Sequence, residues 1–563
     1  MPDELVAVPP VAEAPGGARP HALRRCRLAI VLLFAGLYLA SSSGTFLHNP
    51  DSTLMWGVAR QLARGDGWAV APEALTLLGR PYPHLEGVDG RVYFPKGMSY
   101  SAVIVPFCWA GDAFSALLRE PPDPLARAPL GMAVSTAAPA LIAVLEVLLI
   151  FEACLLGGFG PRLAALAALG AGLGTAIWAD SKSVMSEPFI GCMLTLQFYA
   201  LLRYARRDDA RWLAVGSTSL GLILLCQPAL LAIIGPIWAA TVAWIGWRQH
   251  RLSPVRWLRS AVAFGLPLAL ALFVLGWLNL IRYGSVAKTG YWQVGMDFSY
   301  LYMAIYGIFF SAGKSIFLYS PPLLLTIAGA RRWLRKFGAA AAFPLLLFPA
   351  FLALYGCLPY WHGDGAWGPR YFLPLTGGLA ILAAGVLMPR EAQRAPSSAK
   401  RLWGGLTAVG AAVQVIAVLT STAGYFALLI HAGLLGGFDR PWRPIVYDPQ
   451  LSPIVGRSHL LASRVRYSLV GSHDTWTVQR TDGTLATMDL GEADAIDLWP
   501  ARLDYYDIGK RLGQASKIGW IALLVLSGAG AAMLGRSLRP PPALPEPALA
   551  SRRRGEGKRR RRR

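Results

Sequence analysis

Apolar runs of about 17–25 residues, the length at which an α-helix crosses a bilayer, recur along most of this chain of 563 residues. The composition agrees with such spans, since 54% of the residues are hydrophobic and only 15% are charged. A membrane β-barrel would instead show segments of about ten residues with alternating polarity, which the sequence lacks. The pattern therefore predicts an all-α polytopic membrane protein.

We expect a bundle of about twelve spanning helices. Their centres lie near residues 33, 144, 171, 196, 219, 238, 271, 326, 348, 380, 417 and 526. A further apolar segment, Met98 to Leu118, is ambiguous because it contains Pro106, Trp109 and Asp112. The six cysteines fall in or beside apolar runs without metal-binding spacing, so buried thiols are expected.

Positive charge is concentrated between the apolar runs and indicates the topology. The formal net charge is +22, and residues 552–563 alone contribute nine positive charges and one negative charge. Four loops carry four Lys or Arg each: 203–211, 248–259, 331–336 and 390–401. Such loops stay in the cytoplasm. The arginines before the first apolar run share the cytoplasmic side only if the segment 98–118 does not fully cross the membrane. We therefore predict that 98–118 forms a re-entrant or surface helix.

This topology divides the chain into five parts. We expect a disordered cytoplasmic N-terminus, a transmembrane catalytic region whose long outer loop covers about 41–130, an outer soluble insert, a last span and a basic cytoplasmic tail. These parts correspond to residues 1–24, 25–430, 431–516, 517–535 and 536–563. Asp482-Gly483 in the insert is a hairpin-turn pair within an alternating run, so a small, partly β domain is predicted. The basic tail is expected to bind anionic membrane lipids. No nucleic-acid-reading module accompanies the charge, so no nucleic-acid partner is expected.

An aspartate follows the first apolar run directly, in His48-Asn49-Pro50-Asp51. A carboxylate at this membrane–water boundary can meet the phosphate head of a lipid carrier. Apolar residues at helical spacing follow as far as Gly65 and Gly67, and predict an amphipathic helix on the membrane surface. Asp51 is then either a catalyst or only the cap of this helix.

A second carboxylate and two lysines lie in other outer segments. Glu187, in Ser186-Glu187-Pro188, is a candidate catalytic residue together with Asp51, and the alternative is another helix cap. Lys182 nearby could pair with Glu187. Lys314 stands beside glycine and small residues that allow a tight turn, where it could meet a phosphate. The alternative is a lysine that extends to the membrane interface. Lys288 lies in the outer loop 282–302.

The segment 360–371 concentrates charged and aromatic side chains in a glycine-rich turn at the mouth of a span. Aromatic rings suit sugar faces and the membrane interface alike. Arg370 can hold a phosphate through two parallel hydrogen bonds. The interface explains the tryptophans, whereas the Gly-Pro-Arg-Tyr turn favours a functional site. Together with the loops above, the candidate substrate-binding residues are Lys288, Tyr291, Lys314, Tyr319, His362, Asp364, Trp367, Arg370 and Tyr371.

With these motifs the chain resembles the GT-C superfamily of membrane glycosyltransferases. It is most similar to bacterial relatives of protein O-mannosyltransferases and lipid A aminoarabinose transferases. Asp51 stands where that family carries Asp or Asp-Glu after the first span, with Ser52 in place of the second acid. The similar segments are short and lie within about residues 25–390, namely 91–100, 186–188, 311–322 and 367–371. Gln227-Pro228 stands where relatives often carry Arg-Pro, and the insert 431–516 has no counterpart that we recognise.

The resemblance implies an inverting transfer of a sugar from a polyprenyl monophosphate to an acceptor hydroxyl or amine. Asp51 would be the general base. Arg370, helped by Lys314 or Lys288, would stabilise the departing phosphate. Such chemistry requires no cofactor, although Asp51 with Glu187 could bind a divalent cation. The site would lie on the outer face of the plasma membrane, in the cell envelope; neither the sugar nor the acceptor is specified.

Two other functions would use the same lipid carrier. A transporter or flippase for a lipid-linked sugar predicts polar groups near mid-membrane and internal repeats. Glu146 and Glu152 are the strong intramembrane candidates, but they do not share one helix face, and no repeat is evident. A glycan polymerase or ligase of another fold is poorly separated from the transferase by sequence.

Overall fold

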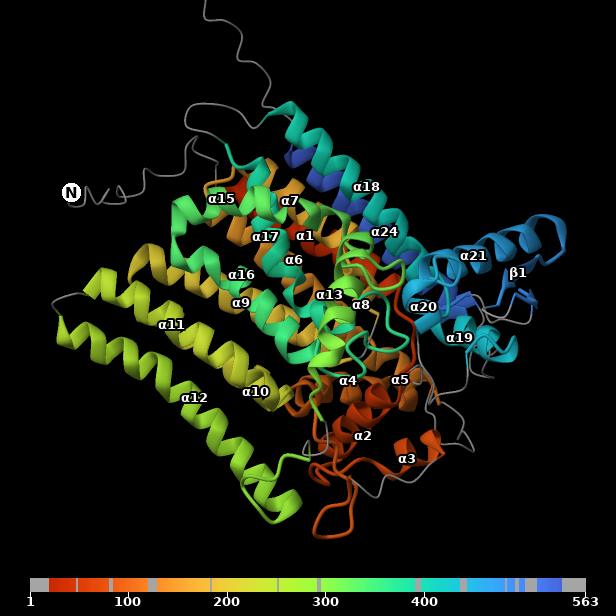
Figure 1. The fold of residues 1–563 in the computed structure, drawn as a ribbon, viewed down its shortest axis with the longest axis horizontal. Helices are drawn as coiled ribbons and strands as arrows, with labels where there is room; N and C mark the ends of the chain where they lie inside the picture. Colours follow the sequence, from red (N-terminus) through yellow and green to blue (C-terminus); the bar gives the residue numbers. More distant parts are fainter. Residues whose placement is uncertain are drawn as a thin grey trace, which may run out of the picture.

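The computed structural model describes residues 20–46, 49–79, 85–119, 129–182, 185–250, 253–290, 295–389, 396–435, 443–480, 483–491, 496–501 and 514–538. These residues form a bundle of helices with one short hairpin (Figure 1). The α-helices are α1 (Pro20–Ala40), α2 (Pro50–Arg64), α3 (Pro72–Leu78), α4 (Met98–Leu117), α5 (Pro129–Ser135), α6 (Ala137–Leu156), α7 (Pro161–Gly174), α8 (Ile177–Asp180), α9 (Ser186–Arg207), α10 (Ala210–Cys226), α11 (Leu231–His250), α12 (Pro254–Tyr283), α13 (Leu301–Phe310), α14 (Ile316–Tyr319), α15 (Thr326–Phe337), α16 (Ala339–Tyr355), α17 (Thr376–Ala383), α18 (Ser397–Leu419), α19 (Thr422–His431), α20 (Arg443–Tyr447), α21 (Pro453–Val470) and α24 (Gln514–Ser537). The 3₁₀ helices are η2 (Pro228–Leu230), η3 (Phe298–Tyr300), η4 (Pro321–Leu325), η5 (Arg370–Leu375) and η6 (Ala384–Leu387).

Seven helical segments of the described chain are long and apolar enough, by length and composition, to cross a membrane. They are α4, α5 with α6, η2 with α11, α12, η5 with α17 and η6, α18, and α24. The predicted class of a helical polytopic membrane protein is confirmed, but the predicted number of about twelve spans is not. Several apolar runs fold as shorter helices: α16, for example, has 17 residues and contains Pro344 and Pro349.

The helix α4 packs along α2. The Ser101 hydroxyl donates to the Met55 carbonyl at 3.0 Å, and Arg60 forms an ion pair with Asp112. Figure 1 shows α2, α3, α4 and α5 together at one end of the bundle, far from α15. Whether α4 crosses the membrane or lies in its surface stays a prediction.

The first and last described helices, α1 and α24, lie side by side in close contact. A Cβ atom at Gly36 would clash with the backbone of α24, and one at Gly530 would clash with the backbone of α1. Small residues permit such close approach of helix backbones inside membranes. The C-terminal helix is thereby packed against the segment that leads to Asp51.

Basic segments that are predicted to share one side of the membrane meet at one end of the bundle. Arg27 on α1 donates two hydrogen bonds to Glu152 on α6, at 2.6 and 2.9 Å. Arg206 and Lys336 donate to backbone carbonyls at the C-terminus of α6, at 2.5 and 2.8 Å. Asp51 follows the other end of α1, whose 21 residues correspond to a length of about 30 Å. The basic end and the Asp51 end are therefore opposite ends of the bundle.

The insert before the last helix contains α20, α21 and an antiparallel hairpin of β1 (Thr475–Gln479) and β2 (Leu485–Asp489). Alternate strand residues face α19 and neighbouring apolar residues, among them the buried Trp476 and Met488. Gly483 has φ 84°, the left-handed conformation that the turn requires, whereas Asp482 lies outside the described residues. The small sheet predicted before the last span is confirmed.

Candidate functional site

Asp51 lies in the first turn of α2, but it is not the cap of that helix. The cap is Asn49, whose side chain accepts a hydrogen bond from the backbone N–H of Asp51 at 2.8 Å. The Asp51 carboxylate instead accepts a hydrogen bond from Nη2 of Arg370 at 3.0 Å. Since Asn49 caps the helix, the carboxylate is left to interact with the neighbouring cations. His48, the first residue of the motif, lies outside the described residues.

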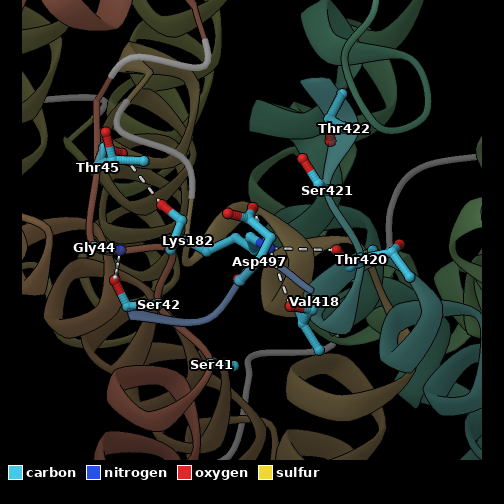
Figure 2. A network of polar contacts seen from close by, with 12 residues as sticks. Ser41, Ser42, Gly44, Thr45, Lys182, Val418, Thr420, Ser421, Thr422 and Asp497 are labelled. Carbon is cyan, nitrogen blue, oxygen red and sulfur yellow. Dashed lines mark hydrogen bonds and ion pairs between the residues drawn. The ribbon is translucent and has the colours of Figure 1, made fainter. Parts of the chain in front are cut away.

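Glu187 occupies the first turn of α9 and is not a cap either. The residue at the cap position, Met185, has no side-chain hydrogen bond to the helix. Glu187 accepts a hydrogen bond from Nε of Arg370 at 2.6 Å, and both residues are about 95% buried, with 4% and 5% of their surfaces exposed. The predicted pairing of Glu187 with Lys182 is wrong, because Lys182 forms its ion pair with Asp497 at 2.9 Å (Figure 2).

One guanidinium, that of Arg370, therefore joins two carboxylates from different helices. Lys96, in the segment before α4, adds a second cation with its Nζ 3.9 Å from Asp51 Oδ2. We call these four residues, Asp51, Lys96, Glu187 and Arg370, the Arg370 cluster. It balances two negative charges with two positive ones. Nη1 of Arg370 makes no hydrogen bond to any residue that the structure describes, so this group can donate to a ligand.

Lys96 is a member that the sequence interpretation did not select. It stands in the segment 91–100, which carries part of the family resemblance. The sequence does contain a signal for it, because Lys96 is a cation just before an apolar helix and could pair with an outer carboxylate such as Asp51.

Lys314 holds the loop that leads to Arg370. Its side chain is fully buried, and Nζ donates to the carbonyls of Asp364, Ala366 and Gly368 at 2.8, 2.8 and 3.0 Å. An ammonium group has three N–H donors, so all of them are used. Burial lowers the pKa of Lys314 to about 7, while the three carbonyl partners favour the charged form. In place of the predicted phosphate contact, the structure gives Lys314 a supporting position.

His362 and Asp364 shape the same turn. Nδ1 of His362 accepts the backbone N–H of Asp364 at 3.0 Å, and burial lowers the pKa of His362 to about 3, so its ring is neutral. Asp364 has φ 51°, and its side chain is 48% exposed. Burial also raises the pKa of Asp364, against the opposing charges of Lys314 and Arg370. Of these two residues, Asp364 is therefore the one whose side chain can reach a ligand.

Tyr371 braces Arg370. The Tyr371 ring stacks on that of Tyr355, with centroids 4.5 Å apart and an interplanar angle of 4°. The Tyr355 hydroxyl accepts a hydrogen bond from Nε2 of Gln227 at 2.8 Å, and the guanidinium of Arg370 lies 5.7 Å from the Tyr371 ring. Gln227 thus supports the site through two stacked rings.

The other nominated residues lie farther from the cluster. Tyr319 and Trp367 are buried and pack edge to face, with centroids 4.9 Å apart, so Tyr319 lies against the turn that contains Trp367. Lys288 is exposed, with its ammonium 5.7 Å from the Tyr283 ring, and forms no ion pair with any described residue. Tyr291 lies outside the described residues.

Four carboxylates singled out from the sequence, Asp51, Glu187, Glu146 and Glu152, have partners among the described residues. Asp51 and Glu187, nominated as a possible cation site, both bind Arg370. Within the described ranges, no three His, Cys, Asp or Glu residues gather as a metal site requires. Glu146 accepts a hydrogen bond from the Thr195 hydroxyl at 3.0 Å, and Glu152 is bound by Arg27. Each of these two glutamates is therefore bound by a polar side chain of a neighbouring helix.

Fold and site together define a multi-pass helical membrane protein with a buried charge cluster at one end of its bundle. No family model matches the chain, and no curated protein matches it. The solved structures that are similar to this chain include two of one protein. ArnT from Cupriavidus metallidurans bound to undecaprenyl phosphate has 14% sequence identity and a TM-score of 0.43, over 92% of this chain and 78% of that chain. The same protein in the apo state has 14% identity and a TM-score of 0.43, over 77% of this chain and 67% of that chain. The similarity is one of fold alone.

Proposed function

We propose that the chain is an integral membrane glycosyltransferase. It moves a sugar from a polyprenyl-phosphate carrier to an acceptor hydroxyl or amine on the extracytoplasmic face. The observation that carries the proposal is the Arg370 cluster, in which Asp51 lies 3.0 Å from a guanidinium just after the first helix. This geometry supplies a base and a phosphate-binding cation side by side, beyond the end of α1.

Arg370 and Lys96 would bind the phosphate of the carrier. Glu187 holds Nε of Arg370 at 2.6 Å and so fixes the plane of the guanidinium, while Nη1 is available to donate. Arg370 and Lys96 each contact the Asp51 carboxylate. A phosphate bound to these two cations would therefore compete with Asp51 for their positive charge. The carboxylate would then be held less tightly and could accept a proton.

In the transfer step, the acceptor oxygen or nitrogen attacks the anomeric carbon of the sugar. The proton of the acceptor passes to the Asp51 carboxylate, and the bond between the anomeric carbon and the phosphate oxygen breaks. The electron pair leaves with the phosphate, whose added negative charge Arg370 and Lys96 stabilise. No step needs an oxidant, a reductant or a nucleotide.

The test uses the purified full-length protein with radiolabelled undecaprenyl-phosphate sugars and bacterial membrane extract as the acceptor source. Undecaprenyl phosphate is the lipid in the ArnT structure and is the first carrier to try. We expect transfer of label from at least one sugar lipid, and we expect transfer to persist in EDTA. Passage of the sugar lipid across vesicles without label transfer would instead support a transporter.

Asp51→Asn is expected to lower turnover roughly a hundredfold or more, the scale of losing a general base, while binding of undecaprenyl phosphate is retained. Asp66→Asn is the matched control, because Asp66 is exposed just after the same helix. Turnover of the Asp51 variant near that of the control would refute the assignment of the base.

A further inference from the structure

Two cations from distant parts of the chain meet at the C-terminus of α18. Lys182 donates to the Val418 carbonyl at 3.0 Å, as Figure 2 shows. Arg457, on α21 of the insert, donates to the carbonyls of Ala417 and Thr420 at 2.6 and 2.5 Å. Cations stabilise the partial negative charge at this end of a helix. We call this arrangement of Lys182, Arg457 and Asp497 around the last carbonyls of α18 the α18 junction.

Arg457 connects the insert to the turn that carries Arg370. It is 2% exposed, and besides the two carbonyls it binds the hydroxyls of Thr420 and Thr422, at 2.8 and 2.9 Å. Its guanidinium lies 4.7 Å from the ring of Trp367, a favourable cation–π arrangement. Trp367 precedes Arg370 by three residues, within the loop that Lys314 holds.

Asp497 connects the insert to the segment that carries Glu187. Its carboxylate pairs with Lys182 at 2.9 Å, and its backbone N–H donates to the Leu419 carbonyl at 3.1 Å. The Lys182 side chain is 10% exposed and the Asp497 side chain is 2% exposed. Lys182 precedes Glu187 by five residues. The α18 junction therefore contacts the turn that carries Arg370, through Trp367, and also contains Lys182, which lies five positions before Glu187.

A third contact joins the insert to the segment of Lys314. The backbone N–H of Gly313 donates to the Val446 carbonyl of α20 at 3.0 Å. The Ile445 carbonyl lies so close to Gly313 that a side chain there would clash with it. Three segments that support the Arg370 cluster are thus each in contact with the insert.

We propose that Arg457 is a positioning residue for the Arg370 cluster, and that the insert sets the geometry of the site through the α18 junction. Arg457 touches no cluster residue itself, so it acts through Trp367 and the turn. The inference rests on the proposed function for its kinetic consequence. Its structural consequence, a fixed turn at 360–371, can be measured independently of any transfer.

The experiment compares Arg457→Gln with Arg464→Gln in the purified full-length protein. Arg464 is the matched control because it lies on the same helix and is exposed. Arg457→Gln is expected to raise amide hydrogen exchange in residues 360–371 and to raise the KM for the sugar lipid, each at least about tenfold. A variant that merely lost folded protein would lower the apparent kcat without changing the KM. If exchange and KM both stay within about twofold of the control, the inference is overturned.

A second pair of variants covers the case in which Arg457→Gln does not fold. Trp367→Leu removes the ring under the guanidinium but leaves the bonds to α18, whereas Trp367→Phe keeps a ring. The leucine variant is expected to show raised exchange and KM, and the phenylalanine variant smaller changes; equal behaviour of the two would contradict the proposal. If the wild type transfers no sugar, the proposed function fails, yet the exchange measurement still decides whether Arg457 positions the turn.

Discussion

Arg370 gives the candidate site its geometry because a guanidinium can bind two carboxylates in fixed directions. Its Nε binds Glu187 and its Nη2 binds Asp51. A lysine would offer a point charge without this planar fork, so it could not hold α2 and α9 in the same mutual orientation. The two carboxylates in turn neutralise the positive charge of this buried guanidinium. Removing either carboxylate would leave that charge only partly neutralised.

His362 should make the stability of the protein depend on pH. Its pKa is about 3 in the fold and near 6.5 when unfolded. Between these values the unfolded chain binds more protons, so stability falls as the pH drops from 6.5 towards 3, by at most about 1.4 kcal/mol per pH unit. In His362→Gln the amide oxygen can still accept the Asp364 N–H without titrating.

We therefore expect the melting temperature of His362→Gln to fall less between pH 7 and about 4.5 than that of the wild type. The measurement is thermal unfolding in detergent across this range. His473→Gln, at an exposed position of the insert, serves as the control. Parallel melting curves for the wild type and His362→Gln would show that this histidine does not contribute.

The sequence could nominate residues of the site but could not assign their contacts. Asp51, Glu187 and Arg370 are candidates because they carry charge and lie in segments that are predicted to be on the outer side of the membrane. The structure brings these three residues together. Lys314 was selected by the same reasoning, yet its ammonium binds three carbonyls. Residue type does not reveal this difference, since a backbone carbonyl that needs a donor has no signature in the sequence. Lys96 has a sequence signal of its own, as a lysine before an apolar helix, but only the fold shows that it lies beside Asp51.

Individual elements were more predictable than their contacts. The amphipathic helix after Asp51 ends as expected, with Gly65 at φ 83° closing α2. The alternating run of the insert forms its hairpin. Both follow from local periodicity and turn chemistry. The α18 junction could not be predicted, because Lys182 and Asp497 are separated by more than 300 residues and their pairing depends on tertiary packing.

The turn 360–371 should depend on Lys314 for its structure. Lys314→Met removes the ammonium group that donates to the carbonyls of Asp364, Ala366 and Gly368, and the expected loss of stability is on the order of 3 kcal/mol. Thermal unfolding and amide exchange of the turn measure this effect. Lys288→Met, at an exposed position, is the control and should change neither. If Lys314→Met instead keeps its melting temperature and loses only binding of undecaprenyl phosphate, Lys314 is a ligand-binding residue as the sequence first indicated.

At the scale of the whole molecule, charge divides the bundle into two unlike ends. The basic end gathers Arg27, Arg206 and Lys336 around the C-terminus of α6. The other end carries the Arg370 cluster and is joined by the insert. The helix α12, with 30 residues and a length of about 45 Å, is long enough to reach from one membrane surface to the other. Its two termini are therefore suitable positions at which to test which end faces outwards.

The proposed function requires the cluster to face away from the cytoplasm, and two valines near opposite termini of α12 allow a matched test. Val88 is 68% exposed, and its N–H donates to the Arg282 carbonyl near the end of α12; Val255 is 77% exposed at the start of α12. The six native cysteines are buried, so their background labelling is expected to be low. In intact cells, a membrane-impermeant maleimide should label Val88→Cys, and should label Val255→Cys only after permeabilisation, because the positive-inside rule keeps the basic end in the cytoplasm. The reverse pattern would place Asp51 and Arg370 on the cytoplasmic side, where an extracytoplasmic acceptor could not reach them.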